Sequence, residues 1–197
     1  MPKIILNKLV IASNNKDKVK EIKSYLDKYN VEIVPSYKLQ VPEPKETQNS
    51  FKGNALLKAY HSVKYTNLPC LGDDSGLVVP ALNGKPGIYS ARWGGPKKDF
   101  NLAMNKVNKK LKNKNTFAWF VCSIALVFPN QKKITFEGRV YGNLTWPPRG
   151  KFGFGYDPMF VPLGYKKTFG EMKESLKSKI SHRYIAFNQF YKSIKFN

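Results

Sequence analysis

The order in which hydrophobic segments change their period is the strongest constraint on the fold of this chain. An extended apolar segment over residues 4–12 is followed by a helical pattern, and the succession of strand and helix then repeats. Further helices are expected over residues 51–64, over 100–111 and from about residue 181, with a hairpin of two long strands over 116–141. This order predicts an α/β fold with a mixed β-sheet flanked by helices.

Residues that favour helix caps mark the start of two of these helices. Ser50 and Asp99 each precede an amphipathic segment and are suited to accept hydrogen bonds from its first amides. The first helix is expected to bury Val19, Ile22, Leu26 and Tyr29. We also expect two short strands on either side of a turn at residues 73–74, and a loop over 84–96. With 197 residues and no evident linker, residues 1–197 are predicted to form a single domain.

The chain carries a formal net charge of +21, which would suit nucleic acid, a membrane surface or an anionic small substrate. Nearly all of the basic residues are Lys, and they are spread along the chain instead of forming one arm. This distribution favours a solvated surface over a specific nucleic-acid site. The longest apolar run, residues 117–128, is too short to span a bilayer, so we expect no membrane partner.

Two cysteines, Cys70 and Cys122, each lie within an apolar run. A secreted disulfide scaffold would contain more of them, so buried free thiols in a reducing compartment are expected. The first residues do not show the pattern of a secretion signal. We therefore expect a cytoplasmic protein.

The adjacent carboxylates of Asp73 and Asp74 lie between the apolar residues Leu71 and Leu77. Two neighbouring carboxylates in hydrophobic sequence are costly to desolvate unless a cation or hydrogen bonds compensate them. Magnesium is a cation suited to such hard oxygen ligands, and it in turn suggests phosphate chemistry. A structural turn held by hydrogen bonds from the aspartates is the alternative.

Two further segments have residues suited to phosphate. Residues 13–18 form a strand-to-helix junction, where unpaired amides attract anions and Lys18 adds a full charge. Asn54 and Lys58 lie one helical turn apart beside an apolar stripe, and Glu46 precedes them. A capped turn and a solvated lysine are the alternative readings of these two segments.

Two C-terminal segments are suited to a flat ring. Glycines alternate with aromatic residues over 150–158, which lets the backbone approach a ring while side chains stack on it. Lys177 and the residues 181–183 at a helix start supply donors for an acceptor such as a purine 6-oxo group. A packed hairpin bend and a capped surface helix are the alternatives.

Taken together, these segments resemble one family, the inosine triphosphate pyrophosphatases, which hydrolyse deaminated purine nucleoside triphosphates. The resemblance extends from Ser13 to Arg183, with the motifs in the order of the family. The best matching segments are residues 51–59, 73–77, 86–92, 152–158 and 181–183. One departure is Asn14, which stands where the family usually has glycine; Asn tolerates left-handed backbone better than most residues.

The resemblance implies cleavage of ITP, dITP and XTP to the nucleoside monophosphate and pyrophosphate. It also implies Mg²⁺, a homodimer, and an elongated mixed sheet in two lobes with a central active-site cleft. Asp74 is the acid expected to activate water, and Glu46 and Asp74 are the expected metal ligands. The positions expected to bind the nucleotide are Ser13, Asn14, Asn15, Lys16, Asp17, Lys18, Lys58, Ser75, Phe154, Gly155, Tyr156, Asp157, Lys177, His182 and Arg183.

Two other functions remain open at this point. A basic nucleic-acid-binding protein would bind DNA or RNA with a steep salt dependence and release no pyrophosphate. A related pyrophosphatase would prefer other altered or pyrimidine nucleotides. The placement of several of the few acids beside glycine in phosphate-site-like turns disfavours the first of these.

Overall fold

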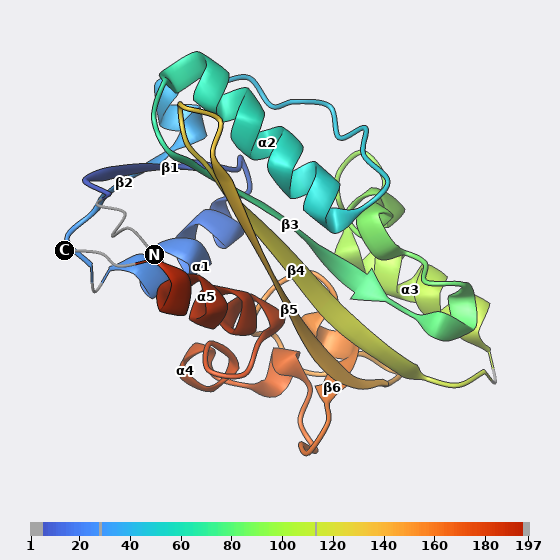
Figure 1. Ribbon diagram of the computed structural model, residues 1–197. Coiled ribbons are helices and arrows are strands. Elements are labelled where there is room, and N and C mark those ends of the chain that lie inside the picture. The colour runs from blue at the N-terminus through green and yellow to red at the C-terminus, as the bar shows by residue number, and fades with distance from the viewer. Residues whose placement is uncertain (1–5, 28, 113, 195–197) are drawn as a thin grey trace. The chain divides into compact units, whose positions relative to one another are not determined.

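The computed structural model describes residues 6–27, 29–112 and 114–194. Six strands form one mixed sheet in the order β2-β1-β3-β4-β5-β6 (Figure 1). Strand β1 (Lys8–Ala12) pairs in parallel with β2 (Glu32–Pro35) and β3 (Cys70–Val78), and β5 (Lys133–Leu144) pairs antiparallel with β6 (Phe160–Pro162). Strand β4 (Phe117–Val127) lies between β3 and β5. The predicted mixed α/β class is confirmed.

Five α-helices accompany these strands in the described residues. They are α1 (Lys16–Leu26), α2 (Phe51–Thr66), α3 (Phe100–Leu111), α4 (Glu174–Lys177) and α5 (His182–Ser193). Short 3-10 turns occupy Ser36–Leu39, Pro80–Leu82, Gly87–Tyr89, Arg92–Gly94, Asp157–Met159 and Phe169–Glu171. The predicted caps are confirmed, since Ser50 accepts a bond from the Gly53 amide and Asp99 accepts from the amides of Asn101 and Leu102.

Contacts divide the chain into two compact units. The first contains the described residues up to Asp74, together with Cys122–Gly138 and the residues from Tyr184 on. The second contains Ser75–Val121 and Arg139–Arg183. Strands β3, β4 and β5 each contribute to both units, and the boundary in β3 falls between Asp74 and Ser75.

In the first unit the strands alternate their side chains between two hydrophobic layers. One layer joins Leu9, Ile11 and Leu71 to the helices α1 and α5, where the rings of Tyr25 and Phe187 lie 5.2 Å apart. The other layer joins the intervening strand positions, such as Val10 and Cys70, to α2. The two-residue period of a strand therefore gives α1 and α5 one face of the sheet and α2 the other (Figure 1).

The second unit has its own core around α3. Ala103, Met104, Val107 and Leu111 of that helix pack into a cluster with residues of β3, β4 and β6. Phe120 and Phe160 contact each other in this cluster, with their ring centroids 4.6 Å apart. The predicted hairpin between β4 and β5 is also present, with Phe128 donating to the Lys132 carbonyl at 2.9 Å.

Several boundaries differ from the prediction. The first helix ends at Leu26, so Tyr29 follows it and Tyr25 takes the buried position, while residues 4–5 of the expected first strand lie outside the described residues. Strand β6 was missed because it lies in a segment rich in Gly and Pro, and helix α4 was missed because its four residues are too few to show a helical period. The predicted loop over 84–96 contains 3-10 turns. Both cysteines are free and buried, as predicted.

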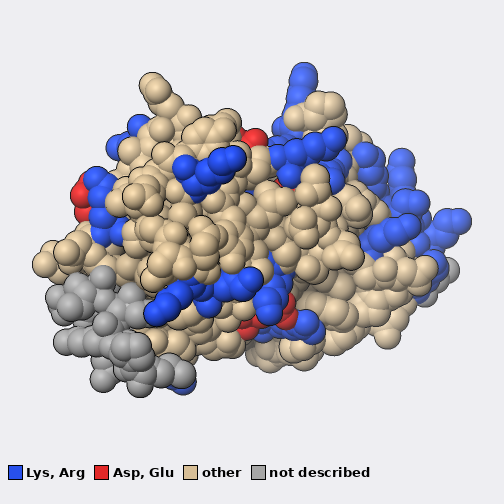
Figure 2. Space-filling model, turned by 45° about the horizontal axis from the view of Figure 1, so that its top comes forward, with Lys and Arg blue, Asp and Glu red and all other residues tan. Residues whose placement is uncertain are grey.

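Basic side chains are distributed over the molecular surface. Figure 2 shows Lys and Arg at several places on the face in view, with acidic side chains much rarer among them. Among the described residues, no helix is both long and apolar enough to cross a bilayer.

Candidate active site

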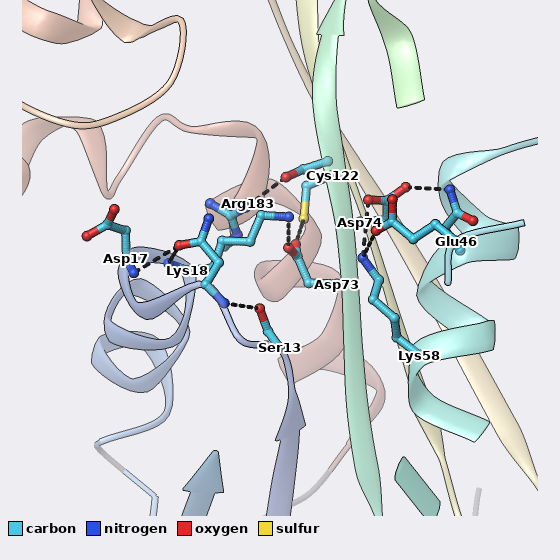
Figure 3. Close-up of polar contacts among 12 residues, drawn as sticks. Ser13, Asp17, Lys18, Glu46, Lys58, Asp73, Asp74, Cys122 and Arg183 are labelled. Atoms are coloured by element: carbon cyan, nitrogen blue, oxygen red, sulfur yellow. Dashed lines mark hydrogen bonds and ion pairs between the residues drawn. The ribbon is translucent and has the colours of Figure 1, made fainter. Parts of the chain in front are cut away.

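Residues 73 and 74 belong to one continuous strand, and the prediction of two strands separated by a turn was wrong. Adjacent carboxylates normally favour an exposed turn, but Asp73 is only 1% exposed and Asp74 only 5%. Because side chains alternate along a strand, Asp73 points to the layer of α1 and Asp74 to the layer of α2. Each carboxylate is therefore compensated by a different helix (Figure 3).

Asp73 lies between a lysine and a cysteine. The Lys18 ammonium, on the first turn of α1, is 2.6 Å from its Oδ1. The Cys122 thiol, on β4, donates to its Oδ2 at 3.0 Å. A carboxylate inside a protein needs such donors on both oxygens to offset its lost hydration.

Asp74 is held by two residues from one face of α2. The Asn54 amide donates to its Oδ2 at 3.1 Å, and the Lys58 ammonium is 3.2 Å from its Oδ1. The same ammonium lies 2.9 Å from Oε1 of Glu46, in the segment before the helix. The predicted association of Glu46, Asn54 and Lys58 is therefore present, and Asp74 joins it (Figure 3).

The ionisation of this pair is shifted by its surroundings. Burial raises the pKa of Asp74 above the ordinary value for aspartate, although Lys58 and Lys18 act in the opposite direction. Burial by itself would lower the pKa of Lys58, but the carboxylates of Asp74, Glu46 and Asp73 raise that pKa above its usual range. Lys58 therefore keeps its charge, and Asp74 is a better proton acceptor than a solvated aspartate.

A glycine allows α2 to reach Asp74. A Cβ atom added at Gly72 would lie 2.1 Å from the Ala55 carbonyl oxygen and 3.0 Å from the Ala59 amide nitrogen. These atoms are backbone, so no side-chain rotation would relieve the clash. The missing side chain at this position sets the short distance between β3 and α2, and thereby places Asn54 and Lys58 next to Asp74.

The predicted phosphate segment forms the N-terminal cap of α1. The Asn15 side chain accepts bonds from the amides of Asp17 and Lys18 at 3.0 and 3.1 Å, and the Ser13 hydroxyl accepts from the Asn15 amide at 3.2 Å. Asn14 does not have a positive φ, so this turn does not need left-handed backbone at that position. Asn14, Lys16 and Asp17 are exposed, whereas Lys18 is largely turned inward to Asp73.

Glu46 and Asp74 are the two carboxylates that could hold a metal ion. Among the described residues there is no group of three or more His, Cys, Asp or Glu side chains arranged as a complete metal site. Two carboxylates that converge on one cation nevertheless fit magnesium, which binds through one or two carboxylates and takes its other ligands from water and substrate phosphates. The Lys58 ammonium already lies beside both carboxylates, so their surroundings accommodate a positive charge.

The second unit contains a separate polar group in the segment after Arg149. Asp157 accepts from the Lys177 ammonium at 2.5 Å and from the Phe154 amide at 2.8 Å. The same ammonium lies 4.8 Å from the centre of the Phe154 ring. Gly153 has φ 72°, and a Cβ atom there would lie 2.1 Å from the Asp157 carboxylate, so only glycine permits this turn.

The other predicted residues of this segment divide between interior and surface. Gly155 also has positive φ and packs beside the Phe100 ring, 3.6 Å from where its Cβ would be. The Tyr156 ring is buried, and its hydroxyl donates to the Ser90 carbonyl at 2.8 Å. Phe154 keeps partial exposure, so of the two predicted aromatic residues its ring is the one available for stacking.

The start of α5 contributes His182 and Arg183 to the second unit. The His182 ring stacks on Phe120 with centroids 5.0 Å apart. Arg183 is only 1% exposed and donates to the Ser75 hydroxyl at 3.0 Å. The guanidinium is thus fixed by the residue that directly follows Asp74 in the strand.

One residue of the polar group around Asp73 and Asp74, Cys122, was not a candidate in the sequence analysis; Asn54 and Asp73 were candidates there, although the family resemblance gave neither of them a role. Asn54 shares a helix face with Lys58, and that spacing was a usable signal. Asp73 is the neighbour of the predicted catalytic acid. Cys122 gave no local signal, because its contact with Asp73 joins residues 49 positions apart on two strands.

The chain belongs to the Ham1 family, which it matches over residues 9–193. The family resemblance inferred from the sequence motifs is thereby confirmed. The dITP/XTP pyrophosphatase of Caulobacter vibrioides is 52% identical over 183 residues, which cover 91% of this chain and 94% of that protein. The dITP/XTP pyrophosphatase of Rhodospirillum centenum is 48% identical over 185 residues, covering 92% of this chain and 91% of that protein.

Solved structures support the same relationship. A HAM1 protein from Coxiella burnetii has a TM-score of 0.89 and 35% identity, and the match covers 95% of this chain and 98% of that one. This structural likeness extends over nearly the whole of both chains.

Proposed function

We propose that this protein hydrolyses deaminated purine nucleoside triphosphates, namely dITP, XTP and ITP, to the nucleoside monophosphate and pyrophosphate. The observation that carries the proposal is the buried group of Asp74, Lys58, Asn54 and Glu46. Its support is the family, in which relatives of high identity are named dITP/XTP pyrophosphatases. The group supplies a base, a cation and two metal-compatible carboxylates.

Asp74, Asn54, Lys58 and Lys18 are proposed to act on the phosphates. Asp74 takes a proton at a carboxylate oxygen from the water that attacks the α-phosphorus, and its raised pKa suits this role. Asn54 fixes the orientation of that carboxylate. Lys58 and Lys18 offset the negative charge of the triphosphate and of the departing pyrophosphate.

Glu46 and Asp74 would hold magnesium, which when bound supplies positive charge against the phosphate oxygens. Two carboxylates are a sufficient protein contribution, because magnesium commonly binds proteins through one or two carboxylates. A chelator should therefore abolish pyrophosphate release, and Mg²⁺ should restore it. Glu46→Gln should increase the Mg²⁺ concentration needed for half-maximal rate.

Phe154, Lys177, His182 and Arg183 are proposed to recognise the base. Phe154 offers a ring face, and Lys177, His182 and Arg183 offer donors for the 6-oxo oxygen. Adenosine has an amino group at that position, so a donor would meet a donor, at a cost of about 1–3 kcal/mol. Recognition of the 6-oxo oxygen therefore excludes ATP more strongly than GTP.

The deciding experiment is a substrate panel with Mg²⁺, scored separately for pyrophosphate and orthophosphate. We expect pyrophosphate from dITP, XTP and ITP, with much slower turnover of ATP and of pyrimidine triphosphates. A preference for pyrimidine or other altered nucleotides would replace the proposed substrates, and orthophosphate as the first product would reject the cleavage site. Binding of DNA with no pyrophosphate release would reject the enzyme altogether.

A further inference from the structure

Cys122 is a buried thiol that the proposed reaction does not use. It is 0% exposed and lies on β4, where the side chains from Phe120 to Val127 are all buried. Its sulfur donates to Oδ2 of Asp73 at 3.0 Å. The sulfur is directed at a carboxylate and has no exposure, so it is not placed to attack a substrate.

The geometry points to a positioning role: we propose that Cys122 fixes the Asp73 carboxylate so that this carboxylate can hold the Lys18 ammonium where a triphosphate binds. This inference rests on the proposed function, in which Lys18 binds phosphate. The three groups form one line of contacts, from the thiol to Oδ2 and from Oδ1 to the ammonium (Figure 3).

Asp73 is suited to be the middle member of this line. An ammonium has three donors, so a bond to Asp73 leaves others for phosphate oxygens. Lys18 reaches the carboxylate across a flexible four-carbon stem, and the 2.6 Å contact with Oδ1 restricts that stem. The location of Lys18 is therefore only as well defined as the orientation of Asp73.

That orientation requires a second contact, because rotation about the last bond of an aspartate side chain has a broad energy minimum. A bond to Oδ2 restricts the rotation and so fixes Oδ1. A thiol is a weak donor, which orients the carboxylate while leaving most of its negative charge to Lys18. The thiol lies in the buried part of β4, where packed neighbours limit its movement.

Cys70 provides a matched control. It is also 0% exposed and free, and its sulfur donates to the Leu68 carbonyl at 3.2 Å, away from the aspartate pair. Replacing either cysteine by alanine removes one buried sulfur. Only the change at position 122 removes a contact to Asp73.

The test compares Cys122→Ala, Cys122→Ser and Cys70→Ala with the natural chain. Two quantities are measured: steady-state release of pyrophosphate from dITP, and calorimetric binding of inorganic tripolyphosphate. Cys122→Ala should raise both the KM for dITP and the dissociation constant of tripolyphosphate about three- to tenfold, with kcat little changed. Cys122→Ser keeps a donor and should restore both constants, and Cys70→Ala should leave both unchanged.

A second arm repeats Cys122→Ala in a Lys18→Ala background, where it should have no further effect, because the residues act through one another. Where Cys122→Ala folds poorly, Cys122→Val refills the volume without a donor and should give the same increase. Equal constants for Cys122→Ala and Cys70→Ala would overturn the positioning role. So would an additive effect in the Lys18→Ala background.

The two proposals fail in different ways. The natural chain could release no pyrophosphate while the dissociation constants of tripolyphosphate still change among the variants as expected. The proposed function would then be wrong, and the positioning role would stand. If dITP is hydrolysed and neither constant responds to Cys122→Ala, the function stands and the positioning role is wrong.

Discussion

The two polar groups of this protein differ in their balance of charge. In the first unit, the three carboxylates of Asp73, Asp74 and Glu46 face the two ammonium groups of Lys18 and Lys58, so these five side chains carry a net charge of −1. In the second unit, Asp157 and Lys177 form a neutral pair beside the Phe154 ring. The first arrangement suits a further cation, and the second suits an uncharged flat group.

This difference is notable in a chain with a formal net charge of +21. A basic surface would attract a polyphosphate without any site, but it would not attract the metal ion that accompanies one. The acids concentrated at one buried position can attract this metal ion, which the surrounding lysines cannot.

The largest expected effect is that of Asp74→Asn. The amide keeps the shape of the side chain but is a far weaker proton acceptor, so pyrophosphate release should fall about 10²- to 10⁴-fold. Circular dichroism should remain unchanged. Asp27→Asn, at an exposed position, is the control. A variant at position 74 that hydrolyses dITP at near the natural rate would show that another group is the base.

Asp157→Asn should have the largest effect on stability. It removes the carboxylate that holds a buried ammonium, at a cost of about 3–5 kcal/mol in the free energy of unfolding. Glu46→Gln should cost less, because Lys58 keeps Asp74 as a partner. Denaturant titration of both variants measures the difference, and equal losses would mean that the two lysines are held alike.

Arg183→Lys should change specificity more than rate. Lysine keeps the charge but loses the planar fork of donors, so the preference for ITP over ATP should fall about tenfold. The ratio of kcat/KM for the two nucleotides is the measurement. An unchanged ratio would assign Arg183 to the support of Ser75 and remove it from base recognition.

The smallest expected effect is a shift in pH dependence. Burial raises the pKa of Asp74, so kcat/KM should decline on acidification at a pH above the ordinary pKa of aspartate, as the base becomes protonated. Lys58 opposes that rise, and Lys58→Met should therefore move the acid limb to still higher pH. If the acid limb does not move, the group that titrates is not influenced by the charge of Lys58.

Much of the first polar group could be predicted from local sequence, since Asn54 and Lys58 share a helix face and Ser50 fixes where that helix begins. The continuity of β3 through residues 73–74 could not be predicted in this way. Adjacent aspartates favour an exposed turn unless partners compensate them, and the partners come from α1 and α2 on opposite sides of the strand. That compensation is a property of the folded chain and is not encoded near residues 73–74.

For the second polar group, too, local sequence predicts only part of the arrangement. Alternating glycine and aromatic residues predicted a segment that approaches a ring, and Gly153 and Gly155 do adopt backbone reserved for glycine. Which ring stays accessible depended on the neighbours, because Ser90 takes the Tyr156 hydroxyl into the interior. Composition alone cannot distinguish Phe154 from Tyr156.

Gly72 has a consequence for anyone who engineers this protein. The residue has no functional group, yet any side chain there would push the backbone of α2 away from β3 and carry Lys58 and Asn54 off Asp74. A random mutagenesis screen for lost turnover would rank position 72 beside the acids. Libraries intended to change substrate choice should keep it as glycine and diversify elsewhere.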